Sequence, residues 1–164
     1  MAGSRPRHLV FESALATAVG KVWAVVGTMD GVNAELGPWF RMTTPAGLES
    51  MRIEDAPLDR ELFASWVLFA GLPVDRHFFR LMQVEPEKGF LEQSTSWTER
   101  RWQHERTLVP TSASSCTVVD RLELTPRLRL MAPLLVRVVG AVFRHRHRRL
   151  RERFGVAWNV GERA

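Results

Sequence analysis

The sequence is poor in cysteine and tyrosine, and each shortage excludes something. Its 164 residues include a single cysteine, Cys116, so neither an intrachain disulfide nor a cysteine-rich zinc site can form. There is no tyrosine, but there are nine Phe and six Trp, so few large side chains carry a hydroxyl that must be satisfied. These features predict a reducing compartment and a broad apolar interior, either filled or hollow.

Long hydrophobic runs are also missing. The longest, Leu130 to Phe143, is interrupted by Pro133 and Arg137 and is shorter than the ~20 residues that span a bilayer. Charged and polar residues interrupt the N-terminal stretch before a secretory core could form. We therefore expect a soluble, cytoplasmic protein.

Motifs for metals, cofactors and hydrolytic catalysis are absent. No phosphate-binding G-x-x-x-x-G-K-[ST] or dinucleotide-binding G-x-G-x-x-G pattern occurs. His145 and His147 are two apart on an expected helix, so they point in different directions, and no metal site is expected. Ser112, Ser114 and Ser115 occupy a turn without a nucleophile-elbow pattern. The sequence predicts no cofactor.

Positive charge is concentrated near the C-terminus. The net charge is +5, and the 23 basic residues include only two lysines. Three interpretations of the segment FRHRHRRLRER remain open: a solvated face, docking on an anionic membrane through Arg144, Arg148 and Arg151, or contact with nucleic acid. No aromatic residues are interleaved with the arginines, which makes nucleic acid the least favoured.

Length and composition predict one domain. The chain is 45% hydrophobic and 25% charged, as in ordinary folded proteins, and no linker or repeat interrupts it. We expect a single domain over 1–164 with a core of about 8–155.

Near the N-terminus, local patterns predict one strand and two short helices. His8 to Leu15 alternates between the two faces of an extended chain. Thr17 is a suitable N-cap for a helix that ends at Gly27. A second short helix spans Asp30 to Leu36 and stops at Gly37-Pro38.

Short strands separated by turn-forming residues predict successive antiparallel hairpins. Leu62 to Ala70 is almost continuously apolar, so we expect this strand to be buried on both faces. A long polar connection occupies 45–59. The expected strands are 38–44, 62–70, 77–84, 89–95, 99–109 and 115–124.

The last predicted element is an amphipathic helix from about Pro133 to Phe154, ending at Gly155. At 1.5 Å per residue it is about 33 Å long, enough to cross a small sheet. Its apolar stripe comprises Leu135, Val138, Val139, Val142, Phe143, Leu150 and Phe154, and Arg137, Arg144, Arg148 and Arg151 lie opposite.

This order of elements resembles the helix-grip fold of the START-like superfamily, whose bacterial members include the SRPBCC and polyketide cyclase/dehydrase-like families. The resemblance covers Leu9 to Gly155. A W-x-H strand, Trp102 to His104, is followed after a turn by T-x-x-D, Thr117 to Asp120. Further segments that carry the resemblance are GPWFRMT (37–43), GLPVDRHFFRL (71–81), WQHER (102–106), VVDRLELTPR (118–127) and FRHRHRRLRERFG (143–155).

The resemblance implies an α+β protein in which a curved antiparallel sheet of six to seven strands wraps around the long C-terminal helix. Two short helices follow the first strand. In that superfamily a cavity between sheet and helix takes a lipid, a polyketide or another apolar molecule. Apolar pockets with a few convergent polar groups are where small ligands bind.

His104 and Asp120 form the main polar candidate. If the turn between their strands centres near Ser112, His104 lies opposite Asp120, and Trp102 lies opposite Leu122. A structural cross-strand pair worth ~0.2–1 kcal/mol is one interpretation. The others are a polar pair on the cavity wall, and a general base, His104, oriented by Asp120.

We expect the walls to be mainly aromatic and aliphatic, with His104, Arg106 or Asp120 as polar anchors. A buried arginine could hold a ligand carboxylate bidentately. The expected function is binding of an apolar or amphipathic small molecule; the alternatives are an aromatase/cyclase-type enzyme and a module that docks on anionic membranes. The expected wall residues are Trp23, Trp39, Trp66, Phe69, Phe78, Trp102, Val139 and Phe143.

Overall fold

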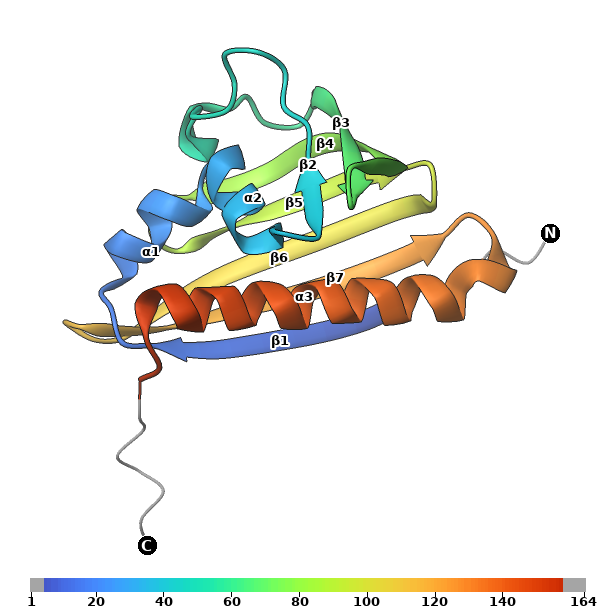
Figure 1. The fold of residues 1–164 in the computed structure, drawn as a ribbon. Coiled ribbons are helices and arrows are strands. Elements are labelled where there is room, and N and C mark those ends of the chain that lie inside the picture. The colour runs from blue at the N-terminus through green and yellow to red at the C-terminus, as the bar shows by residue number, and fades with distance from the viewer. Residues whose placement is uncertain (1–4, 158–164) are drawn as a thin grey trace, which may run out of the picture.

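The strands form one curved antiparallel sheet, seen in the computed structural model, which describes residues 5–157 (Figure 1). The strands are β1 (Arg7–Leu15), β2 (Phe40–Met42), β3 (Glu61–Phe69), β4 (Leu72–Glu85), β5 (Gly89–Ser96), β6 (Glu99–Ser112) and β7 (Ser115–Pro126). Their order across the sheet is β1-β7-β6-β5-β4-β3-β2. Apart from β1, which pairs with β7, neighbours in the chain are neighbours in the sheet, as the short turns predict.

Two short helices and one long helix complete the domain. They are α1 (Val19–Val26), α2 (Met29–Leu36) and α3 (Ala132–Phe154), with 3-10 turns at Ile53–Asp55 and Arg129–Met131. Thr28 caps α2, because its Oγ1 accepts a hydrogen bond from the Gly31 amide at 3.0 Å. The predicted cap at Thr17 is wrong: α1 begins after Ala18 and has no side-chain cap.

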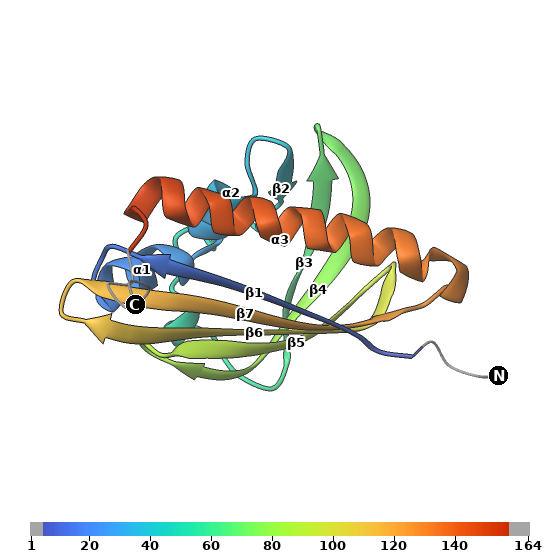
Figure 2. The same ribbon diagram turned by 90° about the horizontal axis from the view of Figure 1, so that it is seen from below.

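Helix α3 lies along one side of the sheet and packs on β1, β7 and α2. Figure 2 shows the opposite side of the sheet, β3 and β4, bending up beside the helix. Two groups of buried apolar side chains fill the space near β1 and β7, one around Leu15 and Trp23 and the other around Leu124 and Phe143. The predicted α+β helix-grip fold is confirmed.

The expectation that Leu62 to Ala70 is buried on both faces is wrong. In β3 only Ser65 is buried, and the other residues are half-buried or exposed. The strand lies next to the edge strand β2, and within residues 5–157 its main neighbours are β2 and β4. A continuous apolar run therefore does not by itself distinguish a central strand from one near an edge.

The hairpin between β3 and β4 is tighter than predicted, so β4 begins at Leu72 rather than near His77. Ala70 and Gly71 have φ values of 47° and 84°, as a two-residue turn of the primed type requires. Phe69 pairs directly with Leu72 across this turn. The longer β4 extends the wall of the space beneath α3.

Candidate functional site

A cavity of about 310 Å³ lies between α3 and the inner face of the sheet. Strands β2 to β6, helix α2 and the segment around Ile53 contribute to its wall. From α3 come Leu135, Val138, Val139, Val142 and Phe143, five of the seven predicted stripe residues. Most of the lining is therefore aliphatic or phenyl, and such a surface suits an apolar guest.

Three polar side chains on neighbouring strands interrupt this wall: His77 on β4, Glu92 on β5 and His104 on β6. Glu92 and His104 are direct cross-strand partners. His77 Nε2 lies 2.6 Å from Glu92 Oε1, and the Ser94 hydroxyl donates to the same oxygen at 2.6 Å. His104 Nδ1 lies 3.6 Å from Glu92 Oε2, so Glu92 faces two imidazole rings.

Behind His104, Arg106 connects two buried carboxylates. Its Nε and Nη2 donate to the two oxygens of Asp120, each at 2.7 Å. Its Nη1 and Nη2 donate to Glu35 at 2.8 and 3.0 Å. All three side chains are almost inaccessible to solvent. The guanidinium therefore joins β6, β7 and α2.

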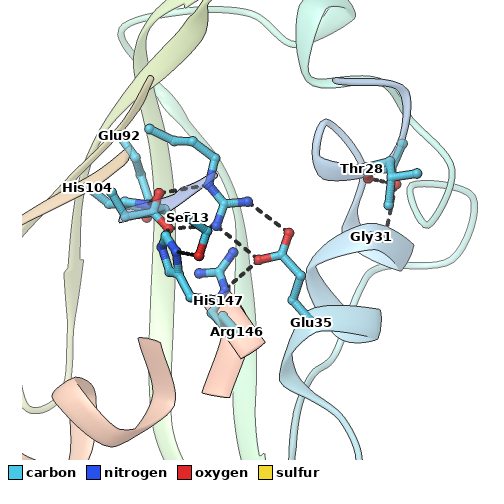
Figure 3. Close-up of polar contacts among 11 residues, drawn as sticks. Ser13, Thr28, Gly31, Glu35, Glu92, His104, Arg146 and His147 are labelled. Carbon is cyan, nitrogen blue, oxygen red and sulfur yellow. Dashed lines mark hydrogen bonds and ion pairs between the residues drawn. The ribbon is translucent and has the colours of Figure 1, made fainter. Parts of the chain in front are cut away.

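Helix α3 joins the same cluster through Arg146 and His147. Arg146 Nε donates to Glu35 Oε2 at 2.9 Å, so Arg146 and Glu35 face each other across the two helices (Figure 3). His147 Nε2 lies 3.0 Å from Asp120 Oδ2, and its Nδ1 lies 2.8 Å from the Ser13 hydroxyl on β1. The cluster thus connects α2 and α3 to the sheet at one end of the cavity.

The carboxyl groups of this cluster are held ionised. Burial alone would raise the pKa of Glu35 and Asp120, but Arg106 more than offsets it and lowers both pKa values, with help from Arg146 at Glu35 and from His104 at Asp120. Burial opposes ionisation of Glu92 as well, yet His77 and His104 lower its pKa. The cluster therefore consists of mutually compensating charges.

A second polar region of the wall has no such compensation. Glu99, at the start of β6, is 2% exposed, and neither carboxyl oxygen has a hydrogen-bond partner among the described residues. Burial, and then the nearby Asp75 carboxylate, raise the pKa of Glu99 to about 7. The buried Trp102 Nε1 also has no partner among these residues. Glu99, Asp75 and Trp102 all line the cavity.

Of the residues predicted to line the wall, Trp102, His104, Val139 and Phe143 do so. Trp23 instead belongs to the core group around Leu15, and its Nε1 donates to Glu54 at 2.7 Å. Of the four tryptophans expected on the wall, Trp102 is the one found among the described lining residues.

Four further predicted wall residues lie on other surfaces. Trp39 is 60% exposed and Phe69 is 44% exposed. Trp66 packs edge-on against Trp97, and the Arg76 guanidinium lies over Trp66 and Phe78, on the face of the sheet away from the cavity. The sequence pattern predicted these strands, but strand alternation does not reveal which face is inward.

The predicted His104–Asp120 contact is confirmed, with Nε2 and Oδ1 2.9 Å apart, but the predicted register is two residues off. His104 is opposite Leu122, and Asp120 is opposite Arg106, so the contact is diagonal. Since the slip is even, the side chains stay on the expected face. Asp120 and Arg106 are buried and do not line the cavity, so of the three alternative polar anchors, His104, Arg106 or Asp120, it is His104 that lies on the wall.

Several site residues were not predicted, and one signal could have found two of them. Arg146 and His147 fall between Phe143 and Leu150 on the apolar stripe, three and four positions from each, and both are buried. A basic residue on a buried stripe indicates a buried partner. His77 and Glu99 gave no comparable signal, because alternation in a strand is compatible with either face.

The remaining arginines of α3 are exposed, except for Arg151, which is half-buried. Arg148 and Arg149 pair with Glu152 at the helix surface, with N–O distances of 3.6 and 3.2 Å. Arg151 donates to the Ser13 hydroxyl at 2.7 Å, and Arg144 is exposed. Membrane docking through Arg144, Arg148 and Arg151 stays a prediction.

None of the helices within residues 5–157 combines the length and apolar character needed to cross a bilayer. Within the same range, no group of three or more His, Cys, Asp or Glu side chains is arranged to hold a metal ion.

Solved structures with the same architecture come from diverse sources. A START superfamily protein from Mycobacterium smegmatis shares 11% identity with a TM-score of 0.64, covering 90% of this chain and 96% of that chain. ZhuI aromatase/cyclase from Streptomyces sp. R1128 shares 13% identity with a TM-score of 0.60, covering 91% and 96%. A point mutant of Thalictrum flavum norcoclaurine synthase, in complex with a transition-state analogue, shares 12% identity with a TM-score of 0.58, covering 93% and 99%. At such identities these similarities establish the fold alone.

Sequence comparison adds the family. A search of curated proteins finds no match. Residues 13–154 match the family described as "Domain of unknown function (DUF8410)". The chain therefore has a START-like helix-grip fold and belongs to the DUF8410 family.

Proposed function

We propose that this protein binds an apolar or amphipathic small molecule in the cavity between α3 and the sheet. The observation that carries the proposal is the cavity itself, about 310 Å³ of space with a mainly apolar wall. Protein interiors are normally filled to the density of organic crystals, so a space of this size is costly unless something occupies it.

The cavity also reaches the surface, which a binding site requires. Val74 on β4 and Val138 on α3 belong to its lining, and both side chains are solvent-exposed, 52% and 41% respectively. We propose that a ligand enters between these two residues. The buried charge cluster then serves to hold α2 and α3 in place on the sheet, so that the cavity between α3 and the sheet persists when no ligand is bound.

Filling the cavity should abolish binding. We expect Val139→Trp to reduce uptake of the fluorescent apolar probe N-phenyl-1-naphthylamine by at least about tenfold, because an indole would occupy much of the space beneath α3. Fluorescence titration measures this effect. Leu134→Trp, on the same helix but 53% exposed and outside the lining, is the matched control and should bind the probe like the wild type. Equal probe affinity in both variants would contradict the proposal.

Catalysis of the cyclase/dehydratase type is the second candidate, and the position of His77 favours it. One ring nitrogen, Nε2, is held by Glu92, while Nδ1 makes no hydrogen bond within residues 5–157. A histidine oriented by a carboxylate, with its other nitrogen free at a cavity wall, can act as a general base. His104 suits this role less well, because both of its ring nitrogens face carboxylates.

This second candidate predicts dehydration of a linear poly-β-keto thioester. A base removes a proton from the carbon between two carbonyls, that carbon attacks a distal carbonyl, and the new alkoxide takes up the proton. Loss of a second proton from the same carbon then expels the hydroxyl group as water and forms a carbon–carbon double bond. We expect mass spectrometry to detect a product lighter by one water, and its formation to fall by about a hundredfold in His77→Ala. His104→Ala is the comparison variant. Turnover that depends on His104 and not on His77 would contradict the assignment.

A further inference from the structure

Glu99 is the most unusual group on the cavity wall. Four buried side-chain nitrogen or oxygen atoms in the described part of the chain have no hydrogen-bond partner: both oxygens of Glu99, Trp102 Nε1 and Arg76 Nε. Three of these four belong to residues that line the cavity. An unpaired buried carboxyl group is costly, and native proteins rarely keep one without a use for it.

The surroundings of Glu99 lack a compensating cation. The nearby Asp75 carboxylate already accepts hydrogen bonds from the Ser96 hydroxyl at 2.7 Å and from the Thr98 hydroxyl and amide at 2.6 and 3.2 Å. Arg127, which follows β7, donates its Nε to the Ser96 carbonyl at 2.8 Å and forms no ion pair with either acid in the described structure. This region of the wall therefore carries acidic groups without basic partners.

The other charged part of the wall cannot supply the missing partner. His77 and His104 are engaged by Glu92, and Arg146 is engaged by Glu35. Among the described residues of α3 that line the cavity, Arg146 is the only charged one, and the others are apolar. The partner of Glu99 must then come from whatever occupies the space.

We propose that the ligand carries a protonated nitrogen, such as an aliphatic amine, that pairs with the Glu99 carboxylate while its apolar body lies against α3. This inference rests on the proposed function and specifies its ligand class. The Trp102 indole N–H, unpaired on the same wall, is placed to donate to an oxygen or other acceptor on that ligand. The protein's net charge of +5 disfavours cations in general, so a preference for an amine must come from the local site.

Three compounds with one decyl chain and different head groups separate the possibilities. Decylamine, decan-1-ol and decanoate are compared by displacement of N-phenyl-1-naphthylamine at about pH 8, above the pKa of Glu99 and below that of an alkyl amine. We expect the amine to bind at least about tenfold more tightly than the alcohol, and decanoate to bind most weakly.

Variants of Glu99 assign the preference to this residue. Glu99→Gln should bind decan-1-ol like the wild type while losing the tenfold advantage of decylamine, and Glu99→Asp, which keeps the charge, should retain part of it. Glu105→Gln, on the outward face of the same strand and about half exposed, is the matched control and should keep the full preference.

The outcomes are distinguishable. If the probe binds but the wild type does not distinguish amine from alcohol, the amine assignment is overturned and the proposed function stands. A preference for decanoate would overturn it in favour of Arg146 as the anchor. An amine preference that survives in Glu99→Gln would also overturn it. Failure of the probe and of all three decyl compounds to bind would overturn both proposals.

Discussion

Arg106→Met is expected to lower the free energy of unfolding by about 3–5 kcal/mol, the cost of removing one partner from a buried ion pair. The side chain is 1% exposed and donates to both Asp120 and Glu35. Without it the two buried carboxylates keep, among residues 5–157, only Arg146, His104 and His147 as charged or ionisable partners. Chemical denaturation followed by tryptophan fluorescence measures the change.

The pH dependence of this loss identifies its electrostatic origin. Glu35 and Asp120 have pKa values lowered in the folded protein from ordinary values of 4.5 and 3.8. A lowered pKa contributes stability that is present above the ordinary value and is lost as the pH falls below it. The difference in the free energy of unfolding between the wild type and Arg106→Met should therefore become smaller as the pH falls below about 4. A pH-independent difference would indicate a packing defect and contradict the electrostatic origin.

Two further variants complete this test. Arg106→Lys keeps the charge but not the planar guanidinium group that reaches two carboxylates. It should therefore lower the free energy of unfolding, but by less than Arg106→Met does. Arg121→Met removes an arginine of the neighbouring strand β7 that is 54% exposed and only loosely paired with Glu105, at 3.9 Å. We expect this control to stay within about 0.5 kcal/mol of the wild type.

The sequence predicted the fold well because periodicity and turn chemistry are local. The order of strand, two helices, hairpins and long helix follows from patterns within a few residues of each other. The stripe on α3 predicted its buried side closely enough that five of its residues line the cavity. Turns such as Pro86 to Gly89 located the strand ends to within a few residues.

The site could be predicted only in part because it depends on strand register and on which face of each element is turned inward. Both are set by long-range contacts. Glu35 meets Arg106 across 71 positions and Arg146 across 111 positions in the chain. Nothing local to α2 distinguishes Glu35 from an exposed glutamate. Similarly, alternation along β3 and β4 does not show whether Trp66 or His77 faces inward, because the curvature of the sheet determines which face is the inner one.

Ionisation of Glu99 should destabilise the free protein at neutral pH and above. Its pKa is raised from 4.5 to about 7, so between these values the folded state keeps a proton that the unfolded state releases. Stability therefore falls as the pH rises through this window and then levels off. A shift of this size corresponds to a loss of up to ~3 kcal/mol. Asp75 strengthens the effect, since its charge disfavours a second carboxylate nearby.

Glu99→Gln removes the titrating group while keeping its shape, so the stability of the variant should not decline in this way as the pH rises. The variant should be more stable than the wild type by up to ~3 kcal/mol at about pH 8, and the two should differ little near pH 4.5. Denaturation curves at a series of pH values measure both profiles. The stability of Glu105→Gln should change with pH in the same way as that of the wild type. Parallel profiles for Glu99→Gln would show that Glu99 is already paired in the free protein, since the structure otherwise leaves its ionised form without a partner.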